Sequence, residues 1–110
     1  MKSDNEQKLM ITMFAVGDTV TIYLRGVFNF QSFHAFKSIY MSQLKNSQIN
    51  CVVVDCEHIN YIDSSALEML IILRERLQSA GKSLVLSRPS RFVERVFKIS
   101  KFYELFAIKH

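Results

Sequence analysis

The amino-acid sequence predicts a single α/β domain built on a mixed sheet of about four to five strands, with helices packed mainly on one face. Two observations lead to this prediction. Short segments rich in β-branched and apolar residues alternate along the chain with segments in which apolar residues recur about every 3.6 positions. In addition, each helical segment has one apolar stripe, whereas the central strand segment is apolar on both sides, as in a sheet covered by helices.

The first two strands are predicted to form a hairpin. Residues 9–16 are apolar with β-branched members, and residues 19–24 alternate between apolar and polar side chains. Gly17 and Asp18 supply the turn between them. Arg25 and Gly26 are expected to close the second strand, and an extended passage over residues 27–30 leads to the first helix.

The first helix is predicted over residues 32–45, with Gln31 or Ser32 as its cap. Its apolar stripe consists of Phe33, Phe36, Ile39, Tyr40 and Leu44. Four phenylalanines, at positions 28, 30, 33 and 36, follow one another closely. Most of them are expected in the core, but Phe30 or Phe33 lies close enough to a loop to anchor a binding partner.

The second half of the chain repeats the strand–helix alternation. A buried strand is predicted over residues 49–56, a loop over 57–62, and a helix from Ser64 or Ser65 to Ser79 that Gly81 terminates. A strand over 83–87 follows, and Pro89 is expected in the first turn of a third helix. Residues 102–108 fit either a last helical turn or an edge strand.

Length and composition indicate one domain over residues 9–110, preceded by a polar, flexible tail over residues 1–8. The tail has no apolar core of a signal peptide, and no apolar run approaches the ~18 residues of a membrane span. We therefore expect a cytoplasmic protein without membrane insertion, present as a monomer or a weak dimer. Cys51 and Cys56 are expected to be free thiols because they flank one strand, too far apart for a disulfide.

The charged residues argue against several classes of function. The net charge of +4 is mild, and no dense basic cluster or RNA-binding aromatic motif points to nucleic acid. Arg88, Arg91, Arg95 and Lys98 are spaced for one helical face, which is either solvated or a docking surface for an acidic protein. No histidine has ligands at metal-binding spacing, and His58 lacks the serine elbow of a hydrolase. We expect no metal, no cofactor and no enzymatic activity.

The segment Asp63-Ser64-Ser65 is the strongest functional signal, because it lies where a helix begins. The N–H groups at a helix N-terminus are free and the helix dipole favours an anion there. A serine at this place can cap the helix or accept a phosphate. The spacing Ser65-x-x-Glu68 fits a capping box, which favours Ser65 as the cap.

Five sequence segments resemble the STAS domain, and within it the small anti-sigma factor antagonists of bacteria. They are YLRGVF at 23–28, VVVD at 52–55, NYIDSSAL at 60–67, GKSLVL at 81–86 and VFKIS at 96–100. The resemblance covers roughly residues 9–108. Two positions depart from the family pattern: Ala66 replaces the usual glycine, and Asn29 replaces the usual acidic residue.

The resemblance implies a partner switch and a STAS-like sheet. In that family the unphosphorylated antagonist binds an anti-sigma factor that is also a serine kinase, phosphorylation releases the complex, and a PP2C-type phosphatase resets it. The matching acceptor is Ser64, with Ser65 as the alternative. The other reading is a STAS interaction or ligand-sensing module that is not phosphorylated and controls a non-sigma output such as biofilm formation.

The predicted partner surface surrounds the acceptor. Its expected members are Asp63, Ser64, Ser65, Glu57, Met69, Asn29 and Phe30. Met69 is expected to be exposed beside Ser64 as an adaptable contact. Asp63, Glu57 and Glu68 are expected to make this end of the helix acidic, so that a phosphate would repel an acidic partner surface.

Overall fold

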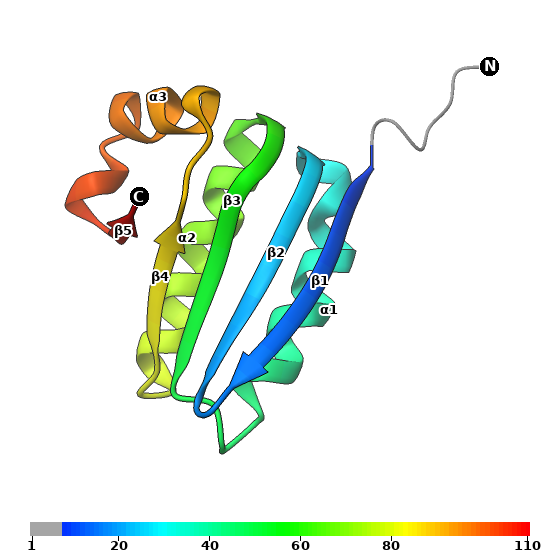
Figure 1. Ribbon diagram of the computed structural model, residues 1–110, viewed down its shortest axis with the longest axis vertical. Helices are drawn as coiled ribbons and strands as arrows, with labels where there is room; N and C mark the ends of the chain where they lie inside the picture. The colour runs from blue at the N-terminus through cyan, green and yellow to red at the C-terminus, as the bar shows by residue number, and fades with distance from the viewer. Residues whose placement is uncertain (1–7) are drawn as a thin grey trace.

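The computed structural model describes residues 8–110, so the predicted tail lies outside the described residues except for Lys8. Five strands form one sheet in the order β1-β2-β3-β4-β5 (Figure 1). The strands are β1 (Leu9–Val16), β2 (Thr19–Phe28), β3 (Cys51–Ile62), β4 (Ser83–Ser87) and β5 (Ala107–Lys109). The helices are α1 (Phe33–Leu44), α2 (Ser64–Ser79) and α3 (Arg91–Ile99), with short 3-10 turns η2 (Phe30–Ser32) and η3 (Phe102–Glu104).

The mixed sheet and its helical cover confirm the predicted fold class. β1 pairs antiparallel with β2, and the three remaining pairs are parallel. Helices α1 and α2 lie side by side behind the sheet, while α3 sits at the end where β3 finishes (Figure 1). We call the face opposite α1 and α2 the open face. In residues 8–110, no helix combines the length and apolarity needed to cross a membrane.

The central strand is longer than predicted, and the expected loop over residues 57–62 is wrong. β3 continues to Ile62 alongside β2, which itself continues past Gly26 to Phe28. Two register shifts interrupt the ladder, between Tyr23 and Arg25 and between Gly26 and Val27. Such bulges break the alternation of buried and exposed residues, so Ile59 and Ile62 are buried although their polar neighbours suggest a loop.

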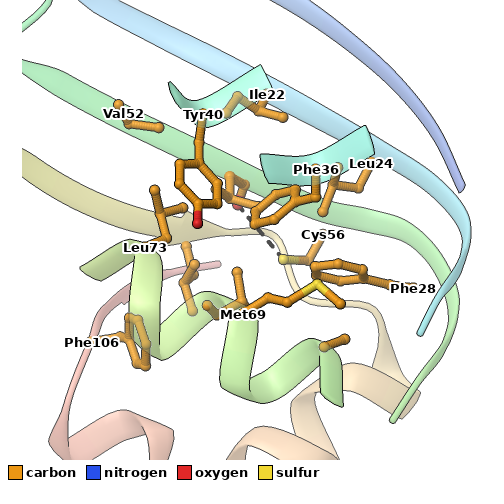
Figure 2. Close-up of a cluster of buried hydrophobic side chains, with 14 of the residues drawn as sticks. Ile22, Leu24, Phe28, Phe36, Tyr40, Val52, Cys56, Met69, Leu73 and Phe106 are labelled. Carbon is orange, nitrogen blue, oxygen red and sulfur yellow. Dashed lines mark hydrogen bonds between the residues drawn. The ribbon is translucent and has the colours of Figure 1, made fainter. Parts of the chain in front are cut away.

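The core lies between the sheet and the two covering helices (Figure 2). The rings of Phe28 and Phe36 have centroids 5.0 Å apart, and Phe36 meets Tyr40 at 5.5 Å. Burial raises the pKa of the Cys56 thiol well above its usual range, and the Asp55 carboxylate adds to this shift. Cys51 and Cys56 are free thiols, as predicted.

The corner between β4 and α3 differs from the sequence prediction. Ser90 is the N-cap of α3 and its hydroxyl accepts a hydrogen bond from the Val93 amide at 3.4 Å, so Pro89 lies before the helix. Arg88 also precedes α3, with φ at +49°, and therefore does not share a helical face with Arg91. The last residues combine both predicted alternatives, because η3 is followed by the edge strand β5.

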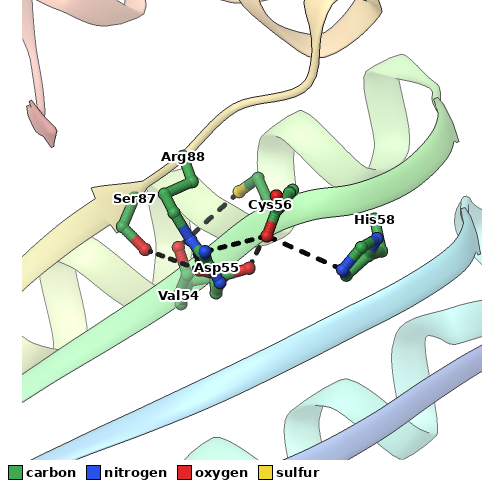
Figure 3. Close-up of polar contacts among 7 residues, drawn as sticks. Val54, Asp55, Cys56, His58, Ser87 and Arg88 are labelled. Atoms are coloured by element: carbon green, nitrogen blue, oxygen red, sulfur yellow. Dashed lines mark hydrogen bonds and ion pairs between the residues drawn. The ribbon is translucent and has the colours of Figure 1, made fainter. Parts of the chain in front are cut away.

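Arg88 is held on the open face by a buried carboxylate (Figure 3). The Arg88 Nε atom lies 2.8 Å from Asp55 Oδ2, and the Arg88 Nη1 atom lies 2.9 Å from Glu57 Oε1. Ser87 Oγ donates to the same Asp55 oxygen at 3.2 Å, and the Glu57 amide donates to the other oxygen at 3.2 Å. The hydrogen bond and charge of Asp55 raise the pKa of the Arg88 guanidinium. This cluster ties β3 to the chain between β4 and α3.

Replacing Gly26 with alanine is expected to destabilise the fold. Gly26 has φ of +106°, and a Cβ there would lie 2.5 Å from the carbonyl oxygen of Lys8. The strained φ alone costs about 1–3 kcal/mol in the free energy of unfolding, and the contact adds to it. Gly17→Ala is the matched control, because Gly17 also has positive φ but nothing lies within 4 Å of the added Cβ. Urea denaturation that shows equal losses for both variants would contradict this account.

Candidate functional site

The candidate site forms where β2 and β3 end together. Phe28 and Ile62 are register partners at the last rung of the parallel ladder. The Asp63 amide then donates to the Phe28 carbonyl at 3.3 Å. The next residues of the two strands, Asn29 and Asp63, therefore lie at the same edge of the sheet, and each begins a helical segment.

Asp63 caps α2, which corrects the predicted capping by Ser65 and Glu68. The Asp63 backbone is extended, and its Oδ1 accepts a hydrogen bond from the Ala66 amide at 2.9 Å. Asp63 and not Ser65 is therefore the N-cap residue, because Asp63 is the last residue before the helix. Ser64 becomes the first helical residue with an exposed side chain, and Ser65 follows it, half-buried.

Asn29 has the equivalent position on the neighbouring strand. Its Oδ1 accepts from the Gln31 amide at 3.0 Å, and its own amide donates to Ser32 Oγ at 3.2 Å. This reciprocal arrangement is a capping box for η2, which leads directly into α1. Ser32 does occupy the cap position of α1, as predicted, but its hydroxyl serves Asn29 and the Val27 carbonyl instead of the helix.

A groove of about 540 Å³ lies between the start of α1 and the first half of α2. It is lined by Phe30, Gln31, Phe33, His34, Ser65, Glu68, Met69 and Ile72. Phe30 is 62% exposed, and Phe33 and Ile72 are each 38% exposed. Large apolar side chains this open to water, rimmed by polar groups, are typical of a binding surface. We call these eight residues the α1–α2 groove.

The structure brings most of the predicted partner residues together at this place. Phe30, Ser65 and Met69 line the α1–α2 groove, and Asp63 and Ser64 adjoin it at the start of α2. The expected exposure of Met69 is wrong, since its side chain is 6% exposed and points into the core (Figure 2). Its position one turn beyond Ala66 places it on the buried stripe of α2, where it forms the floor of the groove.

Glu57 does not belong to the acidic end of α2. Asp63 lies six positions after Glu57 along an extended strand, which corresponds to roughly 20 Å. Its carboxylate pairs with Arg88 at 2.9 Å and lies 3.6 Å from His58 Nε2. The carboxylates at the start of α2 are thus Asp63 and Glu68, and His58 is too far along β3 to act as a base for Ser64.

Sequence reasoning missed Ile72 and His34 as groove residues. Ile72 lies outside the buried stripe of α2, which consists of Ala66, Met69, Leu70, Leu73 and Leu77. An apolar residue off such a stripe is the sequence signal that could have located it. His34 carried no such signal, because a histidine on the polar side of a helix fits plain solvent exposure. Phe33, expected in the core stripe or as an anchor, is half exposed, with Lys37 Nζ 5.5 Å from its ring centre.

Known proteins share both the sequence pattern and the fold. The family model described as the STAS domain matches residues 11–110. A STAS-domain containing protein of Pseudomonas aeruginosa (strain UCBPP-PA14) is 33% identical over 94 residues, covering 86% of this chain and 91% of the relative.

Among residues 8–110, no group of three or more His, Cys, Asp or Glu side chains could hold a metal ion.

Two solved structures show the same fold at low sequence identity. A candidate anti-sigma factor antagonist from Thermotoga maritima superposes with a TM-score of 0.82 at 22% identity, covering 91% of this chain and 86% of that protein. The Bacillus cell-fate determinant SpoIIAA in its phosphorylated form superposes with a TM-score of 0.69 at 16% identity, covering 92% and 90%.

The capping assignment predicts different effects for two neighbouring substitutions. Asp63→Ala should lower the free energy of unfolding by about 0.5–2 kcal/mol, because the Ala66 amide loses its acceptor. Ser65→Ala should change stability by a few tenths of a kcal/mol at most, since alanine suits the first helical turn. Thermal or denaturant unfolding measures both, and a larger loss for Ser65→Ala would show that the cap is misassigned.

Proposed function

Because the chain belongs to the STAS-domain family, we propose that it is a phospho-regulated partner-switching protein of the anti-sigma factor antagonist type. Unphosphorylated, it binds and sequesters an anti-sigma factor that is also a serine kinase, or a similar regulator. Phosphorylation of Ser64 releases that partner, and a PP2C-type phosphatase restores binding. The observation that carries the proposal is the exposed Ser64 hydroxyl at the start of α2, beside the α1–α2 groove.

The position of Ser64 allows a phosphate without loss of the fold. Ser64 is the first residue of a sixteen-residue helix, where the dipole and the free N–H groups favour a dianion. The Asp63 carboxylate already satisfies the Ala66 amide, so the phosphate need not replace the cap. We therefore expect the modified protein to keep its structure and to change only its surface.

The same phosphate would weaken a complex formed over the groove. It adds about −1.5 to −2 charges beside Asp63 and Glu68 and occupies space at an interface. Introducing one uncompensated charge into a docked surface can cost several kcal/mol, and each ~1.4 kcal/mol is a tenfold change in affinity. That is sufficient to dissociate a complex that is tight before modification.

Side-chain exposure favours Ser64 over Ser65 as the phosphate acceptor. Ser64 is exposed, whereas Ser65 is half-buried in the wall of the groove. A kinase needs access to the hydroxyl, and the exposed Ser64 offers more of it than Ser65. The relatives add support, since the structure of SpoIIAA is known in a phosphorylated form and the Thermotoga protein is described as a candidate antagonist.

A second candidate function is ligand sensing without phosphorylation, controlling a non-sigma output such as biofilm formation. The volume of the α1–α2 groove, about 540 Å³, falls in the range of small-molecule sites. In either case we propose a regulatory binding protein of the cytoplasm and not an enzyme. Mass spectrometry of protein purified under native conditions distinguishes the two: a phosphate on Ser64 supports the switch, and a retained small molecule supports sensing.

Three variants test the switch. Protein lacking phosphate should capture its regulator from a lysate of the native host, and the captured regulator can then be titrated. Ser64→Ala should bind with wild-type affinity and resist kinase-dependent release, while Ser64→Asp should bind at least tenfold more weakly. Ser65→Ala is the matched control and should remain releasable. Equal affinity of all these proteins, or release that survives Ser64→Ala, would contradict the proposal.

The groove itself is tested with an exposed aromatic residue. Phe30 is 62% exposed, so Phe30→Ala removes contact area without opening a cavity in the core. We expect partner affinity to fall by tenfold or more, as for an aromatic anchor residue. Ile99→Ala is the control, since Ile99 is 80% exposed on α3, outside the groove. Isothermal titration that finds equal losses for the two variants would place the interface elsewhere.

A further inference from the structure

β1 forms an outer edge of the sheet and pairs only with β2 among the described strands (Figure 1). The N–H and C=O groups on its outer side therefore have no partner strand within residues 8–110. Native proteins protect such edges with charged side chains, prolines, bulges or very short strands, because an open edge can add another strand. Whether β1 carries any of these features decides how the edge behaves.

β1 carries none of them. Its eight residues, LMITMFAV, include no charged residue and no proline, and they pair with β2 without a register shift. On the open face Met10, Phe14 and Val16 are 63%, 64% and 68% exposed. The opposite edge differs, since β5 has three residues and ends at Lys109. The sheet is thus protected at one edge and open at the other.

We propose that β1 pairs antiparallel with β1 of a second copy of this chain, about a two-fold axis through Thr12 and perpendicular to the sheet. Such an axis keeps the open faces of the two copies on the same side, so residues of equal parity meet. Met10 of one copy then lies opposite Phe14 of the other, and Ile11 opposite Met13. Pairs of this kind, apolar against aromatic or apolar, stabilise neighbouring strands.

Charge favours a second copy as the occupant. The protein has a net charge of +4, so the overall electrostatic force between two copies is repulsive. β1 is an exception because it holds no charge, and Asp18 in the turn after it is held toward β2, where its carboxylate accepts hydrogen bonds from Asn50 Nδ2 and Thr19 Oγ1. Antiparallel pairing centred on Thr12 therefore places no like charges opposite each other within the paired strands.

The size of the contact indicates a weak, reversible dimer. Eight residues in a strand span about 26 Å, and two strands side by side bury less than the ~1,600 Å² of a standard stable interface. The pairing would join the two sheets into one of ten strands. Since the two-fold axis reverses the strand direction, the two Ser64 residues would lie at opposite ends of that sheet. Each copy would therefore bind its own partner.

Sedimentation velocity over a range from low micromolar to millimolar protein tests the pairing. Wild type should shift from monomer to dimer as its concentration rises. Larger oligomers should not form, because in the dimer the outer edge of each β1 is already paired with the other copy. Thr12→Lys should stay monomeric, since two lysines would face each other across the axis. Thr21→Lys, on the same face one strand inward, should dimerise like wild type. Circular dichroism verifies that both variants are folded.

A cross-link tests the register independently. In a Cys51→Ser background, Thr12→Cys should form a disulfide-linked dimer on mild oxidation, and Thr21→Cys should not. A wild-type protein that is monomeric at all concentrations, a Thr12→Lys variant that still dimerises, or equal cross-linking of both cysteine variants would overturn the proposal. Partner binding by Thr12→Lys is measured alongside, so that loss of the dimer and failure of the switch are distinguished.

Discussion

The parallel ladder between β2 and β3 is the constraint on which the rest of the structure depends. It joins two strands that are distant in the sequence and continues, through two register shifts, to the last pair, Phe28 and Ile62. Because both strands end on the same rung, the residues that follow them, Asn29 and Asp63, become the caps of two adjacent helical segments. The α1–α2 groove exists because those two segments begin side by side. A shift of one residue in this ladder would reverse the faces of β3 and separate the caps.

The charged groups in the middle of β3 and those just after its end have different roles. Midway along the strand, Asp55 is buried and its carboxylate is satisfied by Arg88, Ser87 and the Glu57 amide. Removing one partner from such a group leaves an unpaired buried charge, which is far more costly than losing a surface ion pair. Arg88 therefore stabilises the fold through Asp55, although its sequence position suggests a basic helix face, and the Glu57 carboxylate pairs with Arg88 and not with the start of α2. The carboxylates near Ser64 are those of Asp63 and Glu68.

The sequence predicts most of the fold because local patterns decide most of the elements. The hairpin follows from Gly17-Asp18 between alternating segments, and α1 and α2 follow from their apolar stripes. The second half of β3 could not be predicted, since two bulges hide the burial of Ile59 and Ile62 among polar neighbours. For the candidate site, periodicity located the start of α2 but not the cap, because Asp63 and Ser65 have similar capping ability and only the backbone angles separate them. The position of Glu57 depends on its pairing with Arg88, which no local pattern shows.

The departure from the family pattern at Ala66 can now be given a physical meaning. Ala66 is fully buried, and its amide is the one that Asp63 caps. A methyl group there packs into the core and favours the helix by roughly 1 kcal/mol over glycine. The substitution therefore makes the start of α2 firmer without touching the Ser64 hydroxyl. A firm helix start holds Ser64 at one place beside the groove whether or not it carries a phosphate. Under the proposed mechanism, the signal then lies in the charge added to a fixed surface and not in the melting of a helix.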